Sequence, residues 1–335
     1  MTGTPEGAYP RSVTPGIENH PCHPDLPPDG VCVGLDWLRC TGAEDLRQDL
    51  EDYVRSLEHA SPTRVPGARH FRAGLIWDPG VLLSWGHKSE ICQIDFQGSR
   101  LRLLSGDCRI ALLTDMLSMG MKPTRIDGAL DYIGQELRIA RNAEESCERG
   151  ELCRLRKYNP DNAYTSRGVI VRRLIKLGGR ESTVCGRIYD KGLEQGVASE
   201  GVWERIEIEF KKSRARSLAE RLVDASDSWP EVLNSCILGA IDFRVANGRS
   251  EHSRRPRADW WHELLVGVEA VTISPENPDR SFDTWHHSFL RAYSKRLVQL
   301  AASVQITVPE LVAWLLEGHV VQLQPADRVT RQFAN

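Results

Sequence analysis

Residues 186–211 read GRIYDKGLEQGVASEGVWERIEIEFK, two runs of alternating polar and apolar side chains around a glycine-containing turn. Because the side chains of a β-strand point alternately to opposite faces, the two runs predict an antiparallel hairpin. One polar side has a tyrosine between two cations, and the other has two glutamates beside an arginine. These residues are Arg187, Tyr189, Lys191, Arg205, Glu207 and Glu209. A hairpin that is merely wet on its polar side fits this pattern as well as an active site does.

A third alternating run, RIDGALDY, begins at Arg125. It places Asp127 and Asp131 on one face and Ile126 and Leu130 on the other. If the three runs share a sheet, one surface carries a tyrosine, up to four carboxylates and several cations. Convergence of three strands on this mixture favours a chemical role.

The order strand, helix, several strands, helix occurs twice along the chain, and IDFQGSRLRLL (94–104) is similar to IEIEFKKSRARSL (206–218). We therefore predict an α+β fold with antiparallel sheets and flanking helices, for which an internal duplication is one explanation. Its halves would span 29–120 and 121–248. Residues 1–28 contain seven prolines and predict a disordered tail, and 249–335 predict a mostly helical C-terminal region.

The chain has 335 residues, a net charge of −3, no run of 18 apolar residues and no apolar core near its start. These features predict a cytoplasmic protein without a membrane partner. The nine cysteines are scattered, which predicts reduced thiols.

Positive charge is concentrated around the opening stretch, with ten basic and three acidic residues between positions 154 and 191 and a second cluster, RSEHSRRPR, at 249–257. Such runs are often only solvated faces, but two clusters flanking the polar strands favour a polyanionic partner. The predicted DNA contacts are Arg154, Arg156, Lys157, Arg172, Arg173, Arg180, Arg205, Arg254 and Arg255.

The polar residues suggest a specific chemistry. A tyrosine has a pKa of about 10 and is a weak nucleophile at neutral pH, but nearby cations favour its phenolate. Carboxylates can hold Mg²⁺ or Mn²⁺, which would polarise a phosphodiester. A tyrosine, a metal ion and a basic groove together indicate transesterification of a DNA strand.

The blocks GLDWLRCT, RIDGALDYIG, GRIYDKGLEQG, WERIEIEFK and IDFRVANGRSEHSRRPRADWW occur in this order between residues 33 and 265. In this order they resemble the Rep_trans group of replication initiation factors. This group comprises rolling-circle plasmid initiators of the staphylococcal type and relatives in phages and integrative elements. The RIYDKGxE block followed by WxRxExE is the most specific part.

The resemblance implies saddle-shaped sheets and a nickase that cuts and rejoins one strand of origin DNA through a 5′-phosphotyrosine, leaving a free 3′-hydroxyl. It places the nucleophile at Tyr189, with Lys191 and Arg187 at the phosphate. The Mg²⁺ or Mn²⁺ ligands would be Asp127, Glu207 and Glu209. The sequence has no His-hydrophobic-His motif, which favours carboxylate ligands.

Several alternatives stay open. Tyr132, Tyr158 and Tyr164 are rival nucleophiles, and Asp36 and Asp95 are expected to echo the acids of the second half without function. The competing function is a non-catalytic protein that binds an origin or operator. Beyond double-stranded and exposed single-stranded origin DNA, candidate partners are a host helicase, a polymerase and a second copy of the chain.

Overall fold

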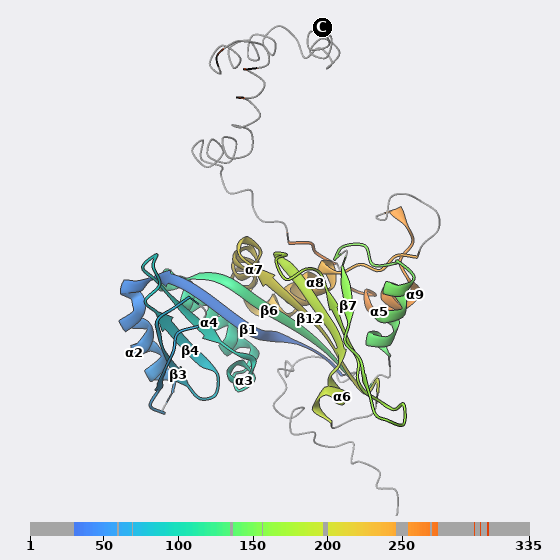
Figure 1. Ribbon diagram of the computed structural model, residues 1–335, viewed down its shortest axis with the longest axis horizontal. Helices are drawn as coiled ribbons and strands as arrows, with labels where there is room; N and C mark the ends of the chain where they lie inside the picture. Colours follow the sequence, from blue (N-terminus) through green and yellow to red (C-terminus); the bar gives the residue numbers. More distant parts are fainter. Residues whose placement is uncertain are drawn as a thin grey trace, which may run out of the picture. The chain divides into compact units, whose positions relative to one another are not determined.

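The fold is taken from a computed structural model (Figure 1). The residues that it describes are 30–58, 60–68, 70–134, 137–155, 157–196, 200–245, 254–268, 270–273, 298, 302 and 307. All but the last three belong to one compact unit, Met1–Pro275, and a second unit spans Glu276–Asn335. The predicted tail and most of the predicted C-terminal helices lie outside the described residues, so the proposed domain boundaries stay predictions.

The first half of the described chain contains a long strand, a helix, a four-stranded meander and a second helical segment. Its elements are β1 (Val31–Ala43), η1 (Glu44–Leu46), α2 (Arg47–Leu57), β2 (Thr63–Val65), β3 (Ala73–Trp77), β4 (Val81–Trp85), β5 (Ile91–Phe96), α3 (Gly98–Leu101) and α4 (Gly106–Ser118). The helical segment after β5 consists of two helices, α3 and α4. The Ser105 side chain accepts a hydrogen bond from the Cys108 N–H at 3.2 Å and so starts α4 anew.

The second half repeats this order, again starting with a long strand. Its elements are β6 (Lys122–Ile133), α5 (Ile139–Glu148), β7 (Tyr158–Pro160), β8 (Ala163–Tyr164), β9 (Ile170–Arg172), β10 (Leu174–Leu177), β11 (Val184–Asp190), α6 (Lys191–Gln195), β12 (Trp203–Lys211), α7 (Ser213–Asp224), η2 (Ser226–Ser228), α8 (Trp229–Ala240) and α9 (Asp259–Leu264).

Ten strands form one antiparallel sheet in the order β2-β3-β4-β5-β1-β6-β12-β11-β10-β7, and β8 and β9 form a separate pair. The long strands β1 and β6 are neighbours at the centre, and each is followed outward by the meander of its own half (Figure 1). The similar segments 94–104 and 206–218 occupy equivalent places, at β5–α3 and β12–α7. The predicted α+β class is confirmed, and the strand order agrees with an internal duplication.

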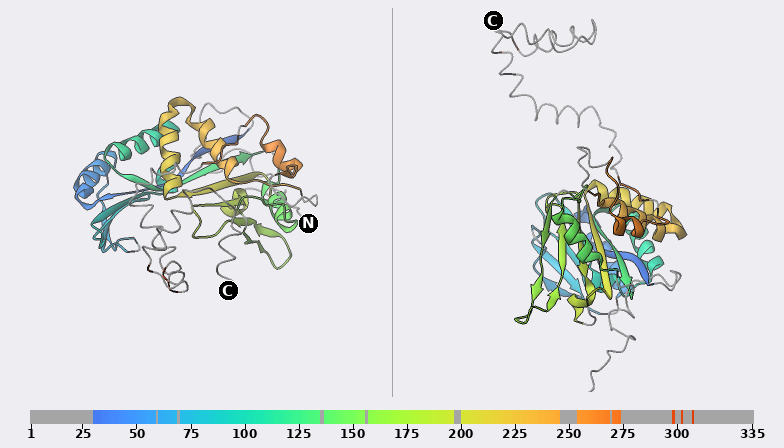
Figure 2. Two further views of the ribbon diagram at one scale, coloured as in Figure 1. Left: turned by 90° about the horizontal axis from the view of Figure 1, so that it is seen from above. Right: turned by 90° about the vertical axis from the view of Figure 1, so that its right-hand side faces the viewer.

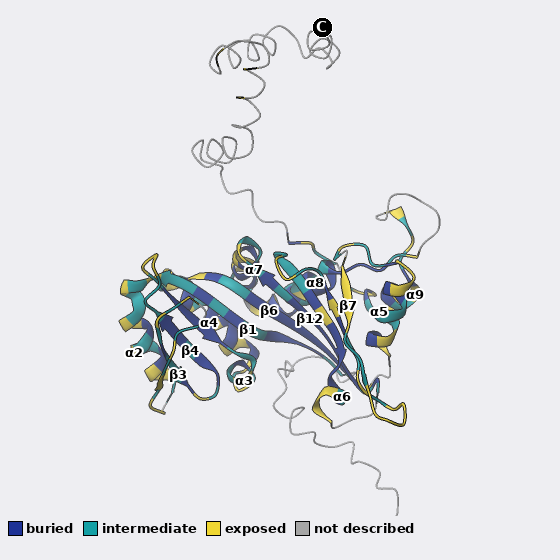
Figure 3. Ribbon diagram, viewed as in Figure 1, coloured by how far each residue is buried: buried dark blue, intermediate teal, exposed yellow. Residues whose placement is uncertain are grey.

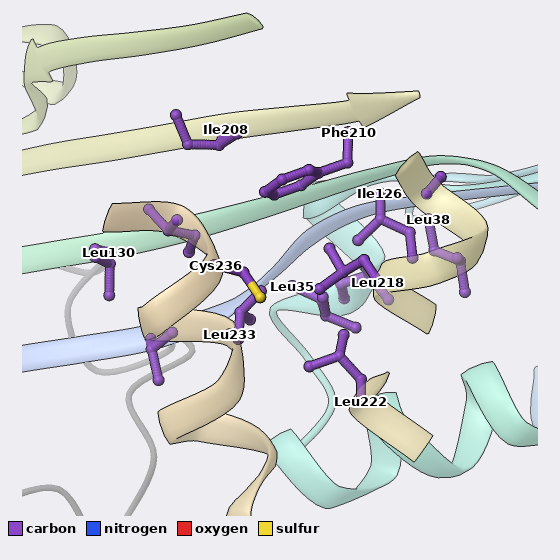
Figure 4. Packing of buried hydrophobic residues seen from close by; sticks show 14 of the residues in the cluster. Leu35, Leu38, Ile126, Leu130, Ile208, Phe210, Leu218, Leu222, Leu233 and Cys236 are labelled. Carbon is purple, nitrogen blue, oxygen red and sulfur yellow. The ribbon is translucent and has the colours of Figure 1, made fainter. Parts of the chain in front are cut away.

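The helices α4, α7 and α8 cover one face of the sheet (Figures 1 and 2). As the alternation predicts, Ile126 and Leu130 of β6 and Ile208 and Phe210 of β12 are buried on this face (Figure 4). Gly128 lets α8 approach closely, because an added Cβ would lie 2.9 Å from the Leu233 and Ile237 side chains. A single core therefore joins the central strands to the helices.

Three smaller observations complete the fold. Trp229 and Trp261 are buried in the core. Seven of the described cysteines are free, but Cys32 is disulfide-bonded, so the expectation of reduced thiols is wrong at that position. Among the described residues, no helix has the length and hydropathy needed to cross a membrane.

Candidate active site

The polar side chains of β6, β11 and β12 lie on the sheet face opposite the helices, as their alternation predicts. Around Tyr189 these polar side chains are buried rather than wet, which the strand pattern alone did not indicate, and most residues of β6 and β12 are buried (Figure 3). Tyr189 is 6% exposed, Glu207 3% and Asp127 1%. Burial makes each polar contact here energetically significant, because an unpaired charge at such a place is costly.

Tyr189 lies near the end of β11, directly opposite Arg205 of β12. Its hydroxyl donates a hydrogen bond to the Glu207 Oε2 atom at 3.2 Å, and the Lys191 Nζ atom lies 5.4 Å from its ring centroid. Burial raises the pKa of the Tyr189 phenol, while the Arg205 cation opposes that rise. The phenol therefore has both a proton acceptor and cations around it.

Glu207 is a buried carboxylate that also forms an ion pair with Arg187. Burial raises the pKa of Glu207, and the positive charge of Arg187 opposes the rise. The Arg187 side chain is 45% exposed, so it extends from the buried carboxylate to the surface. Arg187 is thus placed to meet an anionic group arriving from solvent.

The turn after Tyr189 is fixed by Asp190, a residue that the sequence analysis did not single out. Its carboxylate accepts hydrogen bonds from the N–H groups of Leu193 at 2.8 Å and Gly201 at 2.6 Å. Asp190 is the N-cap of α6, which begins with Lys191. The sequence contained a signal for this role, because an aspartate between a strand and a helix is a typical helix N-cap. Lys191 itself is paired with Glu194.

Arg205 was predicted to contact DNA, and the structure corrects this assignment. It is 2% exposed, and Asp131 accepts two hydrogen bonds from its guanidinium, both at 2.9 Å. The Trp203 Nε1 atom donates to the same carboxylate at 2.6 Å. The Arg205 guanidinium is thus a buried positive charge on the strand next to Tyr189, fixed in place by Asp131.

Asp36 also belongs to this group, although it was expected to be without function. Leu35 pairs with Gly128 and Trp37 with Asp127, so Asp36 is the extra residue of a bulge in β1. Its Oδ1 atom lies 3.2 Å from the Arg205 Nη1 atom. A bulge of this kind re-aims one side chain, and no sequence periodicity announces it.

The predicted metal ligands come together on one face but are occupied by cations. Asp127 lies opposite Glu209 across β6 and β12. The Arg125 Nε atom is 2.8 Å from Asp127 Oδ1 and 3.4 Å from Glu209 Oε1. Burial raises the pKa of Asp127 to about 7, against the lowering effect of Arg125.

Carboxylate oxygens are the donors that Mg²⁺ and Mn²⁺ prefer. Here, however, Arg125 holds Asp127 and Glu209, and Arg187 holds Glu207. Over the described ranges, no three acidic, histidine or cysteine side chains are grouped so as to hold a metal ion. In this arrangement the predicted trio does not fit a divalent cation.

The other predicted DNA contacts are spread over the second half. Arg154 donates hydrogen bonds to the Gly239 carbonyl and the Thr272 hydroxyl, and Arg173 forms ion pairs with Glu144 and Glu200. The remaining described ones are Lys157, Arg172, Arg180 and Arg254, which are exposed, and Arg255, which is partly buried. Arg156 lies outside the described residues.

None of the rival tyrosines has the surroundings of Tyr189. Tyr132 is buried, and burial raises the pKa of its phenol. Tyr158 and Tyr164 are exposed, by 42% and 58% respectively. Among the described residues, Tyr189 is the one of these four whose hydroxyl is hydrogen-bonded to a carboxylate.

Comparison with known proteins identifies the family. The family model described as "Replication initiation factor" matches residues 121–306, more than half of the chain. The chain therefore belongs to the replication initiation factor family, which confirms the resemblance seen in the sequence. The matched span includes Asp127, Tyr189 and Glu207.

The fold is similar to that of the rolling circle replication initiator protein from Geobacillus stearothermophilus. The TM-score is 0.60 and the sequence identity is 19%, with 74% of this chain and 100% of that chain covered. At this identity the likeness concerns the fold. No curated protein matches the sequence.

Proposed function

We propose that this protein is a rolling-circle replication initiator that cuts and rejoins one strand of origin DNA through Tyr189. The observation that carries the proposal is the hydrogen bond from the Tyr189 hydroxyl to the buried Glu207 carboxylate. A nucleophile and a proton acceptor within hydrogen-bond reach are the minimum that covalent catalysis requires. Membership of the replication initiation factor family supports origin DNA as the substrate.

In the proposed step, the Tyr189 oxygen attacks the phosphorus atom and its proton passes to Glu207. A bond from the tyrosine oxygen to phosphorus forms, and the bond from phosphorus to the 3′ oxygen breaks. The 3′ oxygen takes a proton from solvent and leaves as a 3′-hydroxyl, while the 5′-phosphate stays on Tyr189. The reverse reaction rejoins the strand without an external energy source.

The surrounding cations have distinct roles in this proposal. Arg187, half exposed beside Glu207, is placed to contact the phosphate as negative charge develops. Lys191 lies over the tyrosine ring and favours the phenolate. Arg205 acts from the buried side and lowers the pKa of Tyr189 without reaching solvent.

The test uses a supercoiled plasmid that carries the protein's own origin, incubated with the protein and Mg²⁺. We expect relaxed DNA and a covalent protein–DNA adduct on denaturing gels, both lost in Tyr189→Phe. Tyr158→Phe is the matched control and should nick like the parent, because Tyr158 is exposed and lies away from Glu207. Nicking by Tyr189→Phe would refute the assignment. If both proteins only shift the DNA, the competing function of a non-catalytic origin or operator binder holds.

Assistance by Mg²⁺ or Mn²⁺ stays a prediction, and no step above passes through the ion. It is tested by removing metal with EDTA and then restoring Mg²⁺ or Mn²⁺ while the nicking rate is followed. The prediction expects activity to disappear and return. Undiminished nicking in EDTA would refute the metal prediction and leave the tyrosine proposal intact.

A further inference from the structure

A two-stranded arm leaves the large sheet between β7 and β10. We define the arm as residues 161–173, which contain β8 and β9. It projects beyond the edge of the large sheet, near α6 (Figures 1 and 2). None of the buried core side chains of the described residues belongs to the arm.

The arm exposes large apolar side chains that a solvated hairpin does not require. Tyr164 is 58% exposed, Val169 60% and Val171 43%. Three of the large exposed hydrophobic side chains of the described chain thus lie within eight positions of one another. Such a group on a projecting element is typical of a binding surface.

The tip of the arm has a defined shape. The Thr165 N–H donates to the Val169 carbonyl at 2.8 Å, and the Gly168 N–H donates to the Thr165 carbonyl at 2.9 Å. The Thr165 hydroxyl accepts a hydrogen bond from the Val169 N–H at 3.1 Å. The turn therefore presents Tyr164 and Arg167 in a preorganised way, which lowers the entropic cost of binding.

The charge of the arm favours a polyanion. The arm contains three arginines and one acidic residue, Asp161. Arg172 and Lys176 both pair with Asp161, which leaves a surplus of positive charge at that group, whereas Arg173 pairs with Glu144 and Glu200. Over the part of the chain that the structure describes, no ion pair involves Arg167 at the tip.

The arm is connected directly to the candidate active site. Its last residue precedes Leu174, which pairs with Tyr189 across β10 and β11. The Asp190 N–H donates to the Arg173 carbonyl at 3.0 Å, and β9 contacts α6. A DNA strand that approaches Tyr189 from the β7 edge of the large sheet therefore passes the arm.

From these features we infer that the arm binds single-stranded DNA beside Tyr189, with a base stacked on Tyr164 and a phosphate contacted by Arg167. The inference rests on the proposed function. Stacking needs a base that is not already paired and stacked inside a duplex, so the exposed aromatic ring favours a single strand. The positive charge of Arg167 at the tip attracts the phosphate next to the stacked base.

The inference is tested with a fluorescein-labelled oligo-dT of 20 nucleotides and a 20-base-pair duplex, using fluorescence anisotropy. We expect Tyr164→Ala to weaken oligo-dT binding about tenfold and Tyr164→Phe to leave it unchanged, because stacking needs only the ring. Arg167→Ala should lower the slope of log affinity against log salt by roughly 0.7. Duplex binding should change less than twofold in each variant.

Two exposed residues outside the arm supply matched controls. Leu103, 55% exposed, and Arg55, whose side chain is 51% exposed, should be replaceable by alanine without effect on oligo-dT binding. If the double variant Tyr164→Ala/Arg167→Ala binds oligo-dT within twofold of the parent, the inference is wrong. An equal loss of duplex and oligo-dT binding would also overturn it.

These outcomes are separable from those of the proposed function. If the protein nicks DNA through Tyr189 and the arm variants keep full affinity for oligo-dT, only the inference about the arm is refuted. A protein that forms no adduct while the arm variants lose oligo-dT affinity refutes the nicking proposal alone.

Discussion

The two halves of the large sheet share a strand order but differ in the side chains on their polar face. Phe96 of β5 pairs with Leu38 as Phe210 of β12 pairs with Ile126, so Asp95 occupies the place of Glu209 and Gln93 that of Glu207. Gln93 pairs with Ser84 across β4 and β5, where Glu207 pairs with Arg187 across β11 and β12. The described part of the first half therefore has no counterpart of the Arg187–Glu207 ion pair at this position.

The carboxylate of the first half is saturated by donors. Asp95 accepts hydrogen bonds from Trp37 at 2.9 Å, Arg39 at 2.6 Å and Gln93 at 2.7 Å. In the second half, Glu207 is shared between a half-exposed arginine and the Tyr189 hydroxyl. One half of the sheet thus surrounds its carboxylate with donors of the same half, whereas the other pairs a carboxylate with a tyrosine hydroxyl and a half-exposed arginine.

The largest expected effect follows from replacing Glu207. Glu207→Gln keeps the side-chain shape but removes the proton acceptor, so the nicking rate should fall about 10² to 10⁴-fold. Gln93→Ala, at the equivalent place in the first half, should change the rate less than threefold. Initial rates on the origin plasmid measure both. Equal losses in the two variants would show that the halves do not differ in the proposed way.

The next effect concerns stability and compares two buried carboxylates. Asp131→Asn leaves the fully buried Arg205 without its bidentate partner and should cost about 3–5 kcal/mol of unfolding free energy. Asp95→Asn should cost about 1–3 kcal/mol, since the Arg39 side chain is 16% exposed and can be hydrated. Urea unfolding followed by tryptophan fluorescence gives both values. A reversed order would contradict the view that the second half holds the more deeply buried charge.

A smaller effect on stability depends on pH and comes from Glu204. Its carboxylate accepts hydrogen bonds from the first N–H groups of α5, those of Ile139 and Ala140, and the bond from Ala140 is 2.9 Å long. The equivalent helix of the first half, α2, has no side-chain cap. Burial raises the pKa of Glu204 to about 7 from its ordinary value of 4.5.

The folded protein therefore holds a proton that the unfolded chain releases between these two pH values. Its stabilising effect is complete below pH 4.5 and is lost as the pH rises through 7. The part of the loss that is due to Glu204 should reach on the order of 3 kcal/mol, so Glu204→Gln should lose that much less than the parent. Buried Asp127, whose pKa is also raised to about 7, contributes to the loss in both proteins. Unfolding free energies at pH 5 and pH 8 test this, and parallel pH profiles of the two proteins would refute it.

Much of the site could be predicted from the sequence because strand alternation is a local property. The period of two identified the shared faces of Tyr189 and Glu207, and the register across β11 and β12 then brought them within hydrogen-bond distance. The repeated order of elements likewise indicated the two halves before the sheet topology was known.

What the sequence could not reveal depends on contacts between distant segments. The bulge at Asp36 arises where β1 and β6 pair, and the burial of Arg205 depends on Asp131 from a neighbouring strand. Whether a polar face is wet or buried also depends on the whole fold. For this reason Arg205 looked like a surface cation, and Arg125 was not expected between Asp127 and Glu209.

The position of Tyr189 in a fully paired strand has a mechanical consequence. β11 is hydrogen-bonded to β10 on one side and β12 on the other, and Asp190 fixes the turn that follows. In the proposed adduct, tension on the attached DNA strand is delivered to β11 and shared by the hydrogen bonds of both neighbours. The attachment point can then withstand a pulling force, such as that of a motor that unwinds the duplex. If the tyrosine lay on an unpaired loop, the backbone of that loop alone would carry the force.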